Sequence, residues 1–192
     1  MQLLAGRAGQ ILNLSELGGV VGANHKTIDS WLSVLEASYL VFRLEPYFNN
    51  FGKRIIKSPK IYFTDVGLAT HLLRLDTVSE INNYHALGSL FENMVVADTR
   101  KQIFNTLSSN KLYYFRDNKG LEIDLIVDSG NEIIPIEIKS SATFSSDYLG
   151  NLLKFQEISG SDKGRLIYSG NGGDMINDVK ILNYIDELNI NL

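Results

Sequence analysis

Hydrophobic and polar residues alternate along this chain with two different periods, which divide it into helical and extended segments. Apolar residues three and four positions apart predict helices, whereas strict alternation predicts half-buried strands. These patterns predict two short helices within 13–37, strands at 39–46 and 61–63, and helices at 66–73 and 86–107. They then predict a strand at 111–116, a hairpin within 121–140, a helix at 147–159, a strand at 165–169 and an edge strand at 176–182. The polar segment 76–84 is expected to be a linker.

The beginning of the chain follows the order of a winged helix. Two helices with a tight turn between them precede two strands, which is the layout of a helix-turn-helix with a wing. Ser15 and Asn24 are suitable N-caps, because their side chains can accept hydrogen bonds from the first turn of a helix. Four apolar residues at helical spacing predict the buried face of the second helix: Ile28, Trp31, Leu32 and Leu35. We therefore predict a winged-helix-like domain at 1–76 and a second domain at 77–192.

The predicted hairpin carries an unusual set of charges. Gly130-Asn131 suits a two-residue turn, because glycine can take a positive φ at the first central position of a type II′ turn. A turn there places Asp124 directly opposite Glu137. Lys139 then shares their face two residues further on, with Glu122 as its cross-strand partner. The residues between these charges are expected to point into the core: Ile123, Leu125, Ile136 and Ile138.

This charged face allows two interpretations. Like charges that face each other destabilise a strand pair, so the acidic pair needs a counter-ion, a proton or a partner. One interpretation is a solvated ladder with a single salt bridge. The other is a divalent-cation site in which Asp124 and Glu137 supply oxygen ligands and Lys139 adds a fixed positive charge. Mg²⁺ prefers one or two carboxylates together with waters and a substrate phosphate.

Composition limits the function further. The 192 residues include no cysteine, which excludes disulfides and thiolate metal sites, and the net charge of -4 argues against a strongly basic nucleic-acid binder. Residues 1–76 have a surplus of two positive charges, whereas 77–192 have a deficit of six, which suggests two modules with different roles. No signal peptide and no membrane-spanning apolar run is visible, so we expect a cytoplasmic protein without a membrane partner. The chain lacks a P-loop, so we expect no ATP site in it.

Basic residues outside the hairpin are candidates for contacts with nucleic acid. Lys26 lies on the outer face of the second predicted helix, which enters the major groove in DNA-binding winged helices. The segment KRIIKSPK at 53–60 is the most basic of the chain and contributes Lys53, Arg54 and Lys57. Arg116 is a further candidate for contact with the DNA backbone. Winged helices also serve as protein-docking modules, so this segment alone leaves both partners open.

Several motifs resemble known families. Asp124 followed by Pro135-Ile136-Glu137-Ile138-Lys139 resembles the PD-(D/E)XK nuclease superfamily. The segments KSPKIYFTDVGLATHLL, GSLFENMVV, YYFRDNKGLEIDLIV and IPIEIKSS together resemble the C-terminal region of bacterial and archaeal AAA-type ATPases. That region is catalogued as domain of unknown function 4143 (DUF4143).

The resemblance implies both a fold and a site. It implies an α/β (mixed α+β) fold, with a PD-(D/E)XK restriction-endonuclease-like αβββαβ core at 86–169 behind the winged helix-turn-helix. It implies that an ATPase core precedes Met1. It also places Glu92, which lies in the helix before the sheet, on a motif position together with Asp124, Glu137 and Lys139.

Three functional hypotheses follow. In the first, the chain is a DNA phosphodiesterase that depends on Mg²⁺ or Mn²⁺. Glu92, Asp124 and Glu137 bind the metal, and Lys139 orients the attacking water or neutralises charge on phosphorus. In the second, it is a non-catalytic DNA- or protein-binding module coupled to the ATPase, which the acidic balance of the second domain favours. In the third, it is an oligomerisation domain with aromatic contacts at Tyr47, Phe48 and Phe51.

Overall fold

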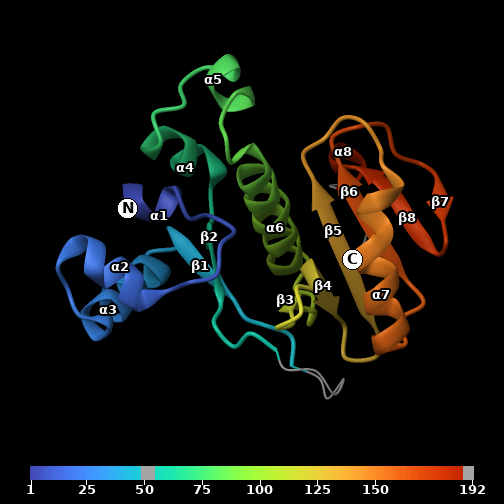
Figure 1. Ribbon diagram of the computed structural model, residues 1–192, viewed down its shortest axis with the longest axis horizontal. Helices are drawn as coiled ribbons and strands as arrows, with labels where there is room; N and C mark the ends of the chain where they lie inside the picture. Colours follow the sequence, from blue (N-terminus) through green and yellow to red (C-terminus); the bar gives the residue numbers. More distant parts are fainter. Residues whose placement is uncertain (49–54, 188–192) are drawn as a thin grey trace.

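The computed structural model describes residues 1–48 and 55–187 of the chain. Helix α6 (Leu87–Asn105) lies between a small N-terminal part and a six-stranded sheet (Figure 1). The N-terminal part contains its own two-stranded sheet, and the larger sheet has the order β3-β4-β5-β6-β8-β7. The mixed α and β class predicted from the sequence is confirmed. Phe51, Lys53 and Arg54, which were predicted to make contacts, lie outside the described residues.

The N-terminal part consists of short helices packed around one strand pair. Its elements are α1 (Gln2–Ala5), α2 (Leu14–Val21), α3 (His25–Ala37), β1 (Val41–Leu44), β2 (Lys60–Phe63) and α4 (Val66–Leu72). Strands β1 and β2 are antiparallel, as expected for the hairpin that follows the two helices. The predicted order of two helices, two strands and a helix is therefore confirmed, with β1 shorter and β2 one residue longer than predicted and with α1 in addition.

Side-chain caps set the first residues of α2 and α3. Asn24 caps α3 as predicted, because its side chain accepts a hydrogen bond of 2.9 Å from the backbone N–H of Thr27. The prediction for α2 was wrong: Asn13, not Ser15, accepts the bond of 3.1 Å from the N–H of Glu16. Asparagine and serine are equally good caps, so sequence alone did not distinguish between them.

The buried face of α3 is narrower than its apolar spacing predicts. Ile28 and Leu32 are buried, but the side chain of Trp31 is 54% exposed. Trp31 lies at the rim of an apolar pocket that Leu17 and Leu35 also line. The prediction of a buried Trp31 was wrong because α2 and the strand pair cover only one side of α3.

Residues 76–84, expected to be a linker, contain the short helix α5 (Val78–Asn82). Thr77 and Glu80 form a capping box at its start. The Thr77 hydroxyl accepts from the N–H of Glu80 at 3.2 Å, and the Glu80 carboxylate accepts from the N–H of Thr77 at 2.8 Å. Each side chain thus satisfies a backbone donor that a helix start leaves without a partner. This capping box was not predicted from the sequence because the segment is polar overall.

Helix α6 is joined to the N-terminal part through a buried asparagine. Asn93 is fully buried, and its side chain accepts from the N–H of Phe63 at 2.7 Å and donates to its carbonyl at 2.9 Å. Phe63 is the last residue of β2. Strand β2 pairs with β1 in a two-stranded sheet, and the Asn93 amide bonds Phe63 as a neighbouring strand would. These bonds fix β2 against α6.

We expect the Asn93→Ala variant to be less stable than the wild type by about 2–4 kcal/mol, because it leaves two buried backbone groups without partners. Urea unfolding followed by circular dichroism measures this difference. Asn105→Ala, at the exposed end of the same helix, is the matched control. An Asn93→Ala variant as stable as the control would show that the two hydrogen bonds contribute little.

The six-stranded sheet contains the predicted hairpin. Its strands are β3 (Lys111–Arg116), β4 (Glu122–Asp128), β5 (Ile133–Lys139), β6 (Gly164–Tyr168), β7 (Met175–Ile176) and β8 (Val179–Asn183). After β5 the chain forms the 3₁₀ helix η1 (Ser146–Leu149) and helix α7 (Gly150–Ser159), and then returns as β6 parallel to β5. Helix α8 (Tyr184–Glu187) follows β8.

The predicted hairpin register is confirmed where strands β4 and β5 pair. Leu125 lies opposite Ile136 and Asp128 opposite Ile133, which is the offset that the turn predicted. Gly130 has a φ of +86°, as expected at the first central position of the turn. The predicted edge strand at 176–182 was wrong in part. Strand β8 lies inside the sheet between β6 and β7, and β7 forms the edge.

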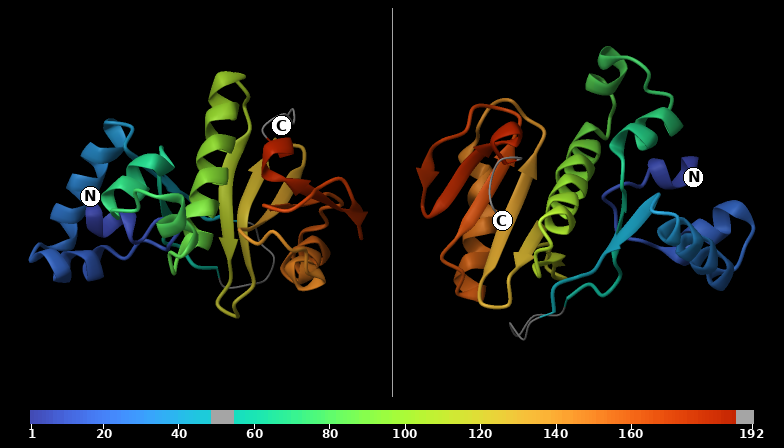
Figure 2. Two further views of the ribbon diagram at one scale, coloured as in Figure 1. Left: turned by 90° about the horizontal axis from the view of Figure 1, so that it is seen from above. Right: turned by 180° about the vertical axis from the view of Figure 1, so that it is seen from behind.

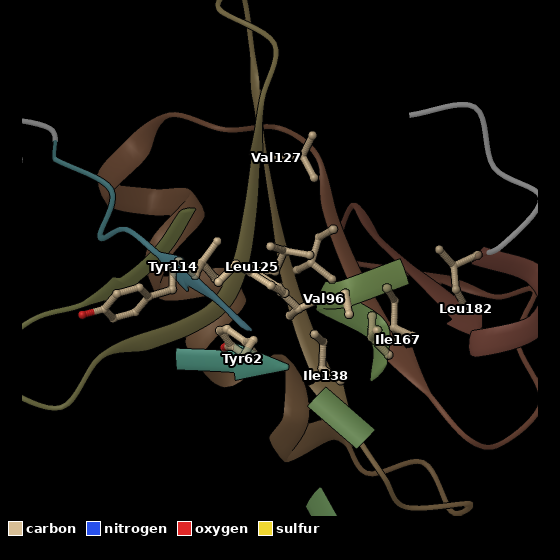
Figure 3. Packing of buried hydrophobic residues seen from close by; sticks show 13 residues of the cluster. Tyr62, Val96, Tyr114, Leu125, Val127, Ile138, Ile167 and Leu182 are labelled. Carbon is tan, nitrogen blue, oxygen red and sulfur yellow. The ribbon is translucent and has the colours of Figure 1, made fainter. Parts of the chain in front are cut away.

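Helices cover both faces of this sheet. Helix α6 packs on one face and α7 on the other (Figure 2). The apolar layer between α6 and the sheet includes Val96 of α6 together with Leu125, Ile138 and Ile167 of the sheet (Figure 3). Tyr62 of the N-terminal part reaches into the same layer, so β2, α6 and the sheet share one core.

A bulge in β4 changes the directions of its side chains. Tyr113 pairs with Ile126 but Phe115 pairs with Ile123, so two residues of β4 lie opposite one residue of β3. As a result Ile123 packs in the layer under α7 and Leu125 in the layer under α6. The expectation that these two residues share a face was therefore wrong. Bulges commonly redirect a side chain beside a functional site, and the residue between these two is Asp124.

Candidate functional site

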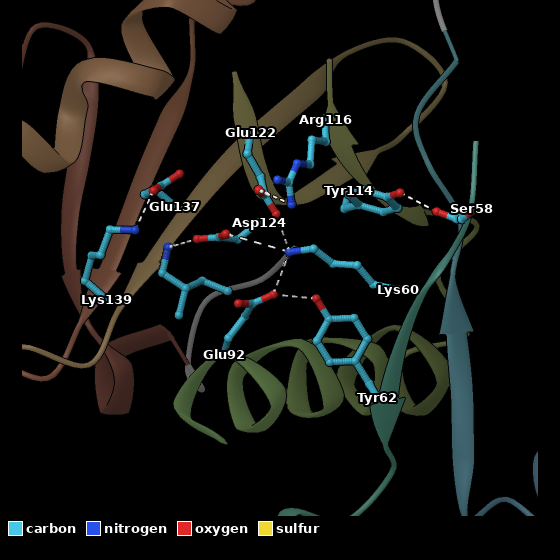
Figure 4. Close-up of polar contacts among 11 residues, drawn as sticks. Ser58, Lys60, Tyr62, Glu92, Tyr114, Arg116, Glu122, Asp124, Glu137 and Lys139 are labelled. Carbon is cyan, nitrogen blue, oxygen red and sulfur yellow. Dashed lines mark hydrogen bonds and ion pairs between the residues drawn. The ribbon is translucent and has the colours of Figure 1, made fainter. Parts of the chain in front are cut away.

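The candidate site lies where β4 and β5 separate, next to α6 and β2. Asp124 marks the point of separation, because its carboxylate accepts the backbone N–H of Ile138 at 2.9 Å in place of a ladder bond. Asp124 is 9% exposed and stands between Glu137 on one side and Lys60 on the other (Figure 4). The sequence predicted Asp124 at this end of the hairpin, but not its bond to Ile138.

Glu137 and Lys139 form one half of the site. The Lys139 amine lies 2.6 Å from Oε1 of Glu137. The second carboxylate oxygen of Glu137, Oε2, is buried and has no hydrogen-bond partner among residues 1–48 and 55–187. The expected pairing of Lys139 with Glu122 was wrong. Glu122 instead binds Arg116 at 3.2 Å and a lysine from the N-terminal part.

Lys60, the first residue of β2, forms the centre of the other half. Its side chain is 3% exposed, and its amine lies 3.0 Å from Glu92, 2.8 Å from Glu122 and 4.0 Å from Asp124. The Tyr62 hydroxyl also donates to Oε1 of Glu92, at 2.5 Å. Thus the acids of α6 and β4 surround an amine that is carried into the site by β2.

The sequence did not identify Lys60 and Tyr62 as site residues. Lys60 was counted only as the end of the basic segment. A signal is visible in retrospect, since Lys60 directly precedes the apolar run Ile61-Tyr62-Phe63, every residue of which is buried. A lysine that is buried together with such a strand is almost always paired with an acid.

Two acids of the site, Glu92 and Glu137, hold their protons more tightly than exposed acids, because their pKa is raised. Burial and then the charge of Asp124 raise the pKa of Glu137 to about 8, although Lys139 acts in the opposite direction. Burial also raises the pKa of Glu92 to about 7, with Lys60 opposing and Asp124 adding to the shift. The charge of Glu92 also raises the pKa of Glu137, so charge on one half of the site changes proton binding in the other half.

The two lysines are held in their charged forms. Burial alone would lower the pKa of Lys60, but Glu92, Asp124 and Glu122 outweigh burial and raise the pKa above its usual value. The pKa of Lys139 is raised as well: burial opposes the shift, and Asp124 and Glu137 produce it. Both amines are therefore fixed positive charges at neutral pH.

A divalent cation fits part of this arrangement. The candidate ligands are all carboxylate oxygens, which hard cations such as Mg²⁺ and Mn²⁺ prefer, and the buried Oε2 of Glu137 lacks a partner among the described residues. Within the part of the chain that the structure describes, no three acids or histidines are already arranged as a metal-binding group. Two amines instead separate the acids: Lys60 lies among Glu92, Glu122 and Asp124, and Lys139 contacts Glu137.

The basic residues predicted to contact nucleic acid fall into two places. The segment with Lys57 runs along the end of β3, because Ile56 donates its N–H to the carbonyl of Arg116 at 2.9 Å. Lys57 is exposed, and the Arg116 side chain is 43% exposed despite its contact with Glu122. Lys26 lies on α3, on the side of the molecule away from the sheet (Figure 1). The structure therefore places Arg116 at the site and the backbone next to Lys57 beside Arg116, whereas Lys26 lies elsewhere.

Comparisons with known proteins define the family. Residues 87–188 match the model of the family described as "Domain of unknown function (DUF4143)", so the chain belongs to this family. Residues 1–79 match a second model, "Domain of unknown function (DUF8612)". The match to DUF4143 covers all the acids of the site, whereas Lys60 lies in the segment that matches DUF8612.

Two curated relatives come from mycobacteria. They are named Uncharacterized protein Mb2031c, from Mycobacterium bovis, and Uncharacterized protein Rv2008c, from Mycobacterium tuberculosis. Each is 33% identical over 141 residues, which are 73% of this chain and 31% of the relative. The chain thus spans about a third of the length of these relatives. No solved structure matches the chain. None of the helices in the described residues has the length and apolar character needed to cross a membrane.

Proposed function

We propose that this chain is a nuclease-like, DNA-interacting module that binds one divalent cation, Mg²⁺ or Mn²⁺, and cleaves phosphodiester bonds. The order α6-β3-β4-β5-α7-β6 agrees with the αβββαβ order of the PD-(D/E)XK fold, and the N-terminal part agrees with a winged helix. Asp124 and Glu137 would hold the cation, with Glu92 completing its acidic surroundings.

The buried Oε2 of Glu137 is the observation that carries this proposal. A buried carboxylate oxygen without a hydrogen bond costs free energy, and proteins rarely keep one that has no use. Lys139 contacts Oε1, the other oxygen of Glu137, at 2.6 Å. A carboxyl group that always stayed neutral would not require an amine beside it. A buried carboxyl group that contacts one amine, and whose second oxygen has no partner among the described residues, is suited to exchange its proton for a cation.

The residues of the site have separate roles in this reaction. A divalent cation bound there would polarise the phosphate and lower the pKa of a water molecule. Lys139 holds a positive charge beside Glu137, where it can orient the attacking water or neutralise charge that develops on phosphorus. Glu137 would serve as an oxygen ligand of that cation, and binding of the cation would displace the proton that burial favours on this carboxyl group.

The DNA backbone would lie along the segment next to β3. Lys57 and Arg116 are adjacent there and exposed enough to contact phosphates, and such contacts would position the strand over the acids. Lys53 and Arg54 belong to the same basic segment, and we include them in this proposed contact on sequence grounds. Lys26 would contact DNA only through the helix-turn-helix.

The wider context is also a proposal. The chain covers 31% of each mycobacterial relative, so the relatives contain about twice as much additional sequence. We propose that an AAA-type ATPase core occupies that additional part, and that the ATPase moves or positions the module on DNA.

The test is a cleavage assay on single-stranded, duplex and branched DNA with Mg²⁺ or Mn²⁺. We expect cleavage that EDTA abolishes and that is lost in Asp124→Ala and Lys139→Ala. Cleavage that persists in both variants would remove these residues from the mechanism. Lack of cleavage on every substrate, with correctly folded protein and added cation, would contradict the nuclease function.

A second function is favoured by the two amines that contact the acids of the site. Lys60 and Lys139 already compensate much of the acidic charge, as expected if the fold is kept as a non-catalytic DNA- or protein-binding module coupled to an ATPase. In that case DNA or a protein partner would bind without any cation. Binding of labelled DNA in EDTA, unchanged by Asp124→Ala, would support this function over cleavage.

A further inference from the structure

The Lys60 amine occupies a point at which acids from two elements converge. Its amine lies 2.8 Å from Glu122 and 3.0 Å from Glu92, and Asp124 lies 4.0 Å away (Figure 4). These acids come from two elements, α6 and β4, and they face a common point. A cation bound at that point would have carboxylate oxygens on several sides.

The charge at this point is only partly compensated. Three carboxylates surround the single positive charge of Lys60, and Arg116 reaches only Glu122, from the outside at 3.2 Å. Buried charges that lack a partner are costly, so removing the amine would leave a strong demand for another cation. A divalent ion would compensate this charge better than one amine does.

The amine is held in place by the fold. Lys60 belongs to β2, and the side chain of Asn93 fixes the last residue of that strand to α6. Tyr62, two residues after Lys60, donates to the same oxygen of Glu92 that the amine contacts. Lys60 is therefore held in the site by contacts of β2 with α6, and it is contributed by the N-terminal part.

We propose that Lys60 is an internal cation that fills one of two adjacent cation positions. The first position, at Asp124 and Glu137, takes a divalent ion, and this part rests on the proposed function. The second, at Glu92, Glu122 and Asp124, takes the Lys60 amine. A divalent ion can enter the second position only when that amine is removed. Lys60 is thus a positioning residue that sets the number of metal ions at one.

The proposal has a consequence for the two parts of the chain. In two-metal sites the two ions lie about 3.5–4 Å apart. Asp124 is the carboxylate that the two proposed positions share. With an amine in place of the second ion, the site is complete only while β2 is docked on α6. The N-terminal part therefore contributes directly to the electrostatics of the site.

The test is to count the Mn²⁺ ions bound by wild type and by Lys60→Met, which keeps the length of the side chain without its charge. The electron paramagnetic resonance signal of free Mn²⁺ measures the bound number directly. We expect Lys60→Met to bind one more ion than the wild type. We also expect Mn²⁺ to raise the melting temperature of Lys60→Met by more than that of the wild type.

Two controls make the count specific. Lys163→Met removes an exposed lysine that pairs with Glu132 at 2.7 Å, and it should leave the number of ions unchanged. The double variant Lys60→Met with Glu122→Gln restores part of the charge balance and removes a ligand, so it should lose the additional ion. If Lys60→Met folds in neither EDTA nor Mn²⁺, or binds as many ions as the wild type, the proposal is overturned.

The count also separates this proposal from the proposed function. If the wild type binds no ion and Lys60→Met binds one, the position at Asp124 and Glu137 fails while the Lys60 position stands. If the wild type binds one ion and Lys60→Met also binds one, the position at Asp124 and Glu137 stands while the Lys60 position fails.

Discussion

The Glu137→Gln variant is expected to be more stable than the wild type at pH 8 and, on the proposed function, to bind a divalent cation more weakly. Burial raises the pKa of Glu137 to about 8, so the folded protein holds this proton more tightly than the unfolded chain does. Stability linked to this proton is present at low pH and is lost as the pH rises from about 4.5 to about 8. Glutamine remains neutral throughout, so at pH 8 it avoids a loss on the order of 4 kcal/mol.

The measurement is urea unfolding in EDTA at pH 5 and at pH 8. The gain from Glu137→Gln should be large at pH 8 and small at pH 5, because the wild-type carboxyl is protonated at the lower pH. Glu132→Gln, on the same hairpin but exposed, is the matched control and should show no such pH dependence. A Glu137→Gln variant less stable than the wild type at pH 8 would contradict the raised pKa.

The hairpin that carries Glu137 was predictable from the sequence alone. Alternation and Gly130-Asn131 were sufficient to predict the hairpin and its register, because a two-residue turn leaves only one pairing. The register in turn placed Asp124 and Glu137 at the same end of β4 and β5. The turn and the alternation therefore sufficed to predict that the two strand acids lie at the same end of the hairpin, without knowledge of the rest of the fold.

The bulge was the first limit of local rules. The alternation in β4 ends at Asp124 and is followed by three consecutive apolar residues, Leu125-Ile126-Val127. All three are buried, on both faces of a sheet covered by two helices. That run contained the signal that simple alternation does not continue through β4, although it did not say where the extra residue lies.

Lys60 was the second limit. It lies 62 positions before Glu122 in the sequence, and only the packing of β2 against α6 brings the two together. No periodicity within a segment can predict an ion pair between segments this far apart. The same reason explains Trp31, whose spacing was correct for a helix face but whose neighbours do not extend far enough to cover it.

Asp124 joins both halves of the site, and its replacement is expected to have the largest effect on activity. Asp124→Asn keeps the shape of the side chain and an oxygen that can accept the N–H of Ile138. It removes the negative charge, so any cation held with Glu137 loses a ligand. On the proposed function, DNA cleavage should fall by on the order of 10³-fold while the fold is retained.

A readout besides activity follows from the same charge. Asp124 raises the pKa of Glu137 and of Glu92, so the pKa of both should fall in Asp124→Asn, as carbon-13 NMR titration of labelled glutamates would report. Asp128→Asn, at the other end of β4, where the carboxylate accepts from the N–H of Gly130 at 2.8 Å, is the control. If Asp124→Asn lowered both pKa values but left cleavage intact, the acids would be coupled as described without serving catalysis. If it changed neither pKa, the electrostatic link between the two halves, on which the one-ion site depends, would be wrong.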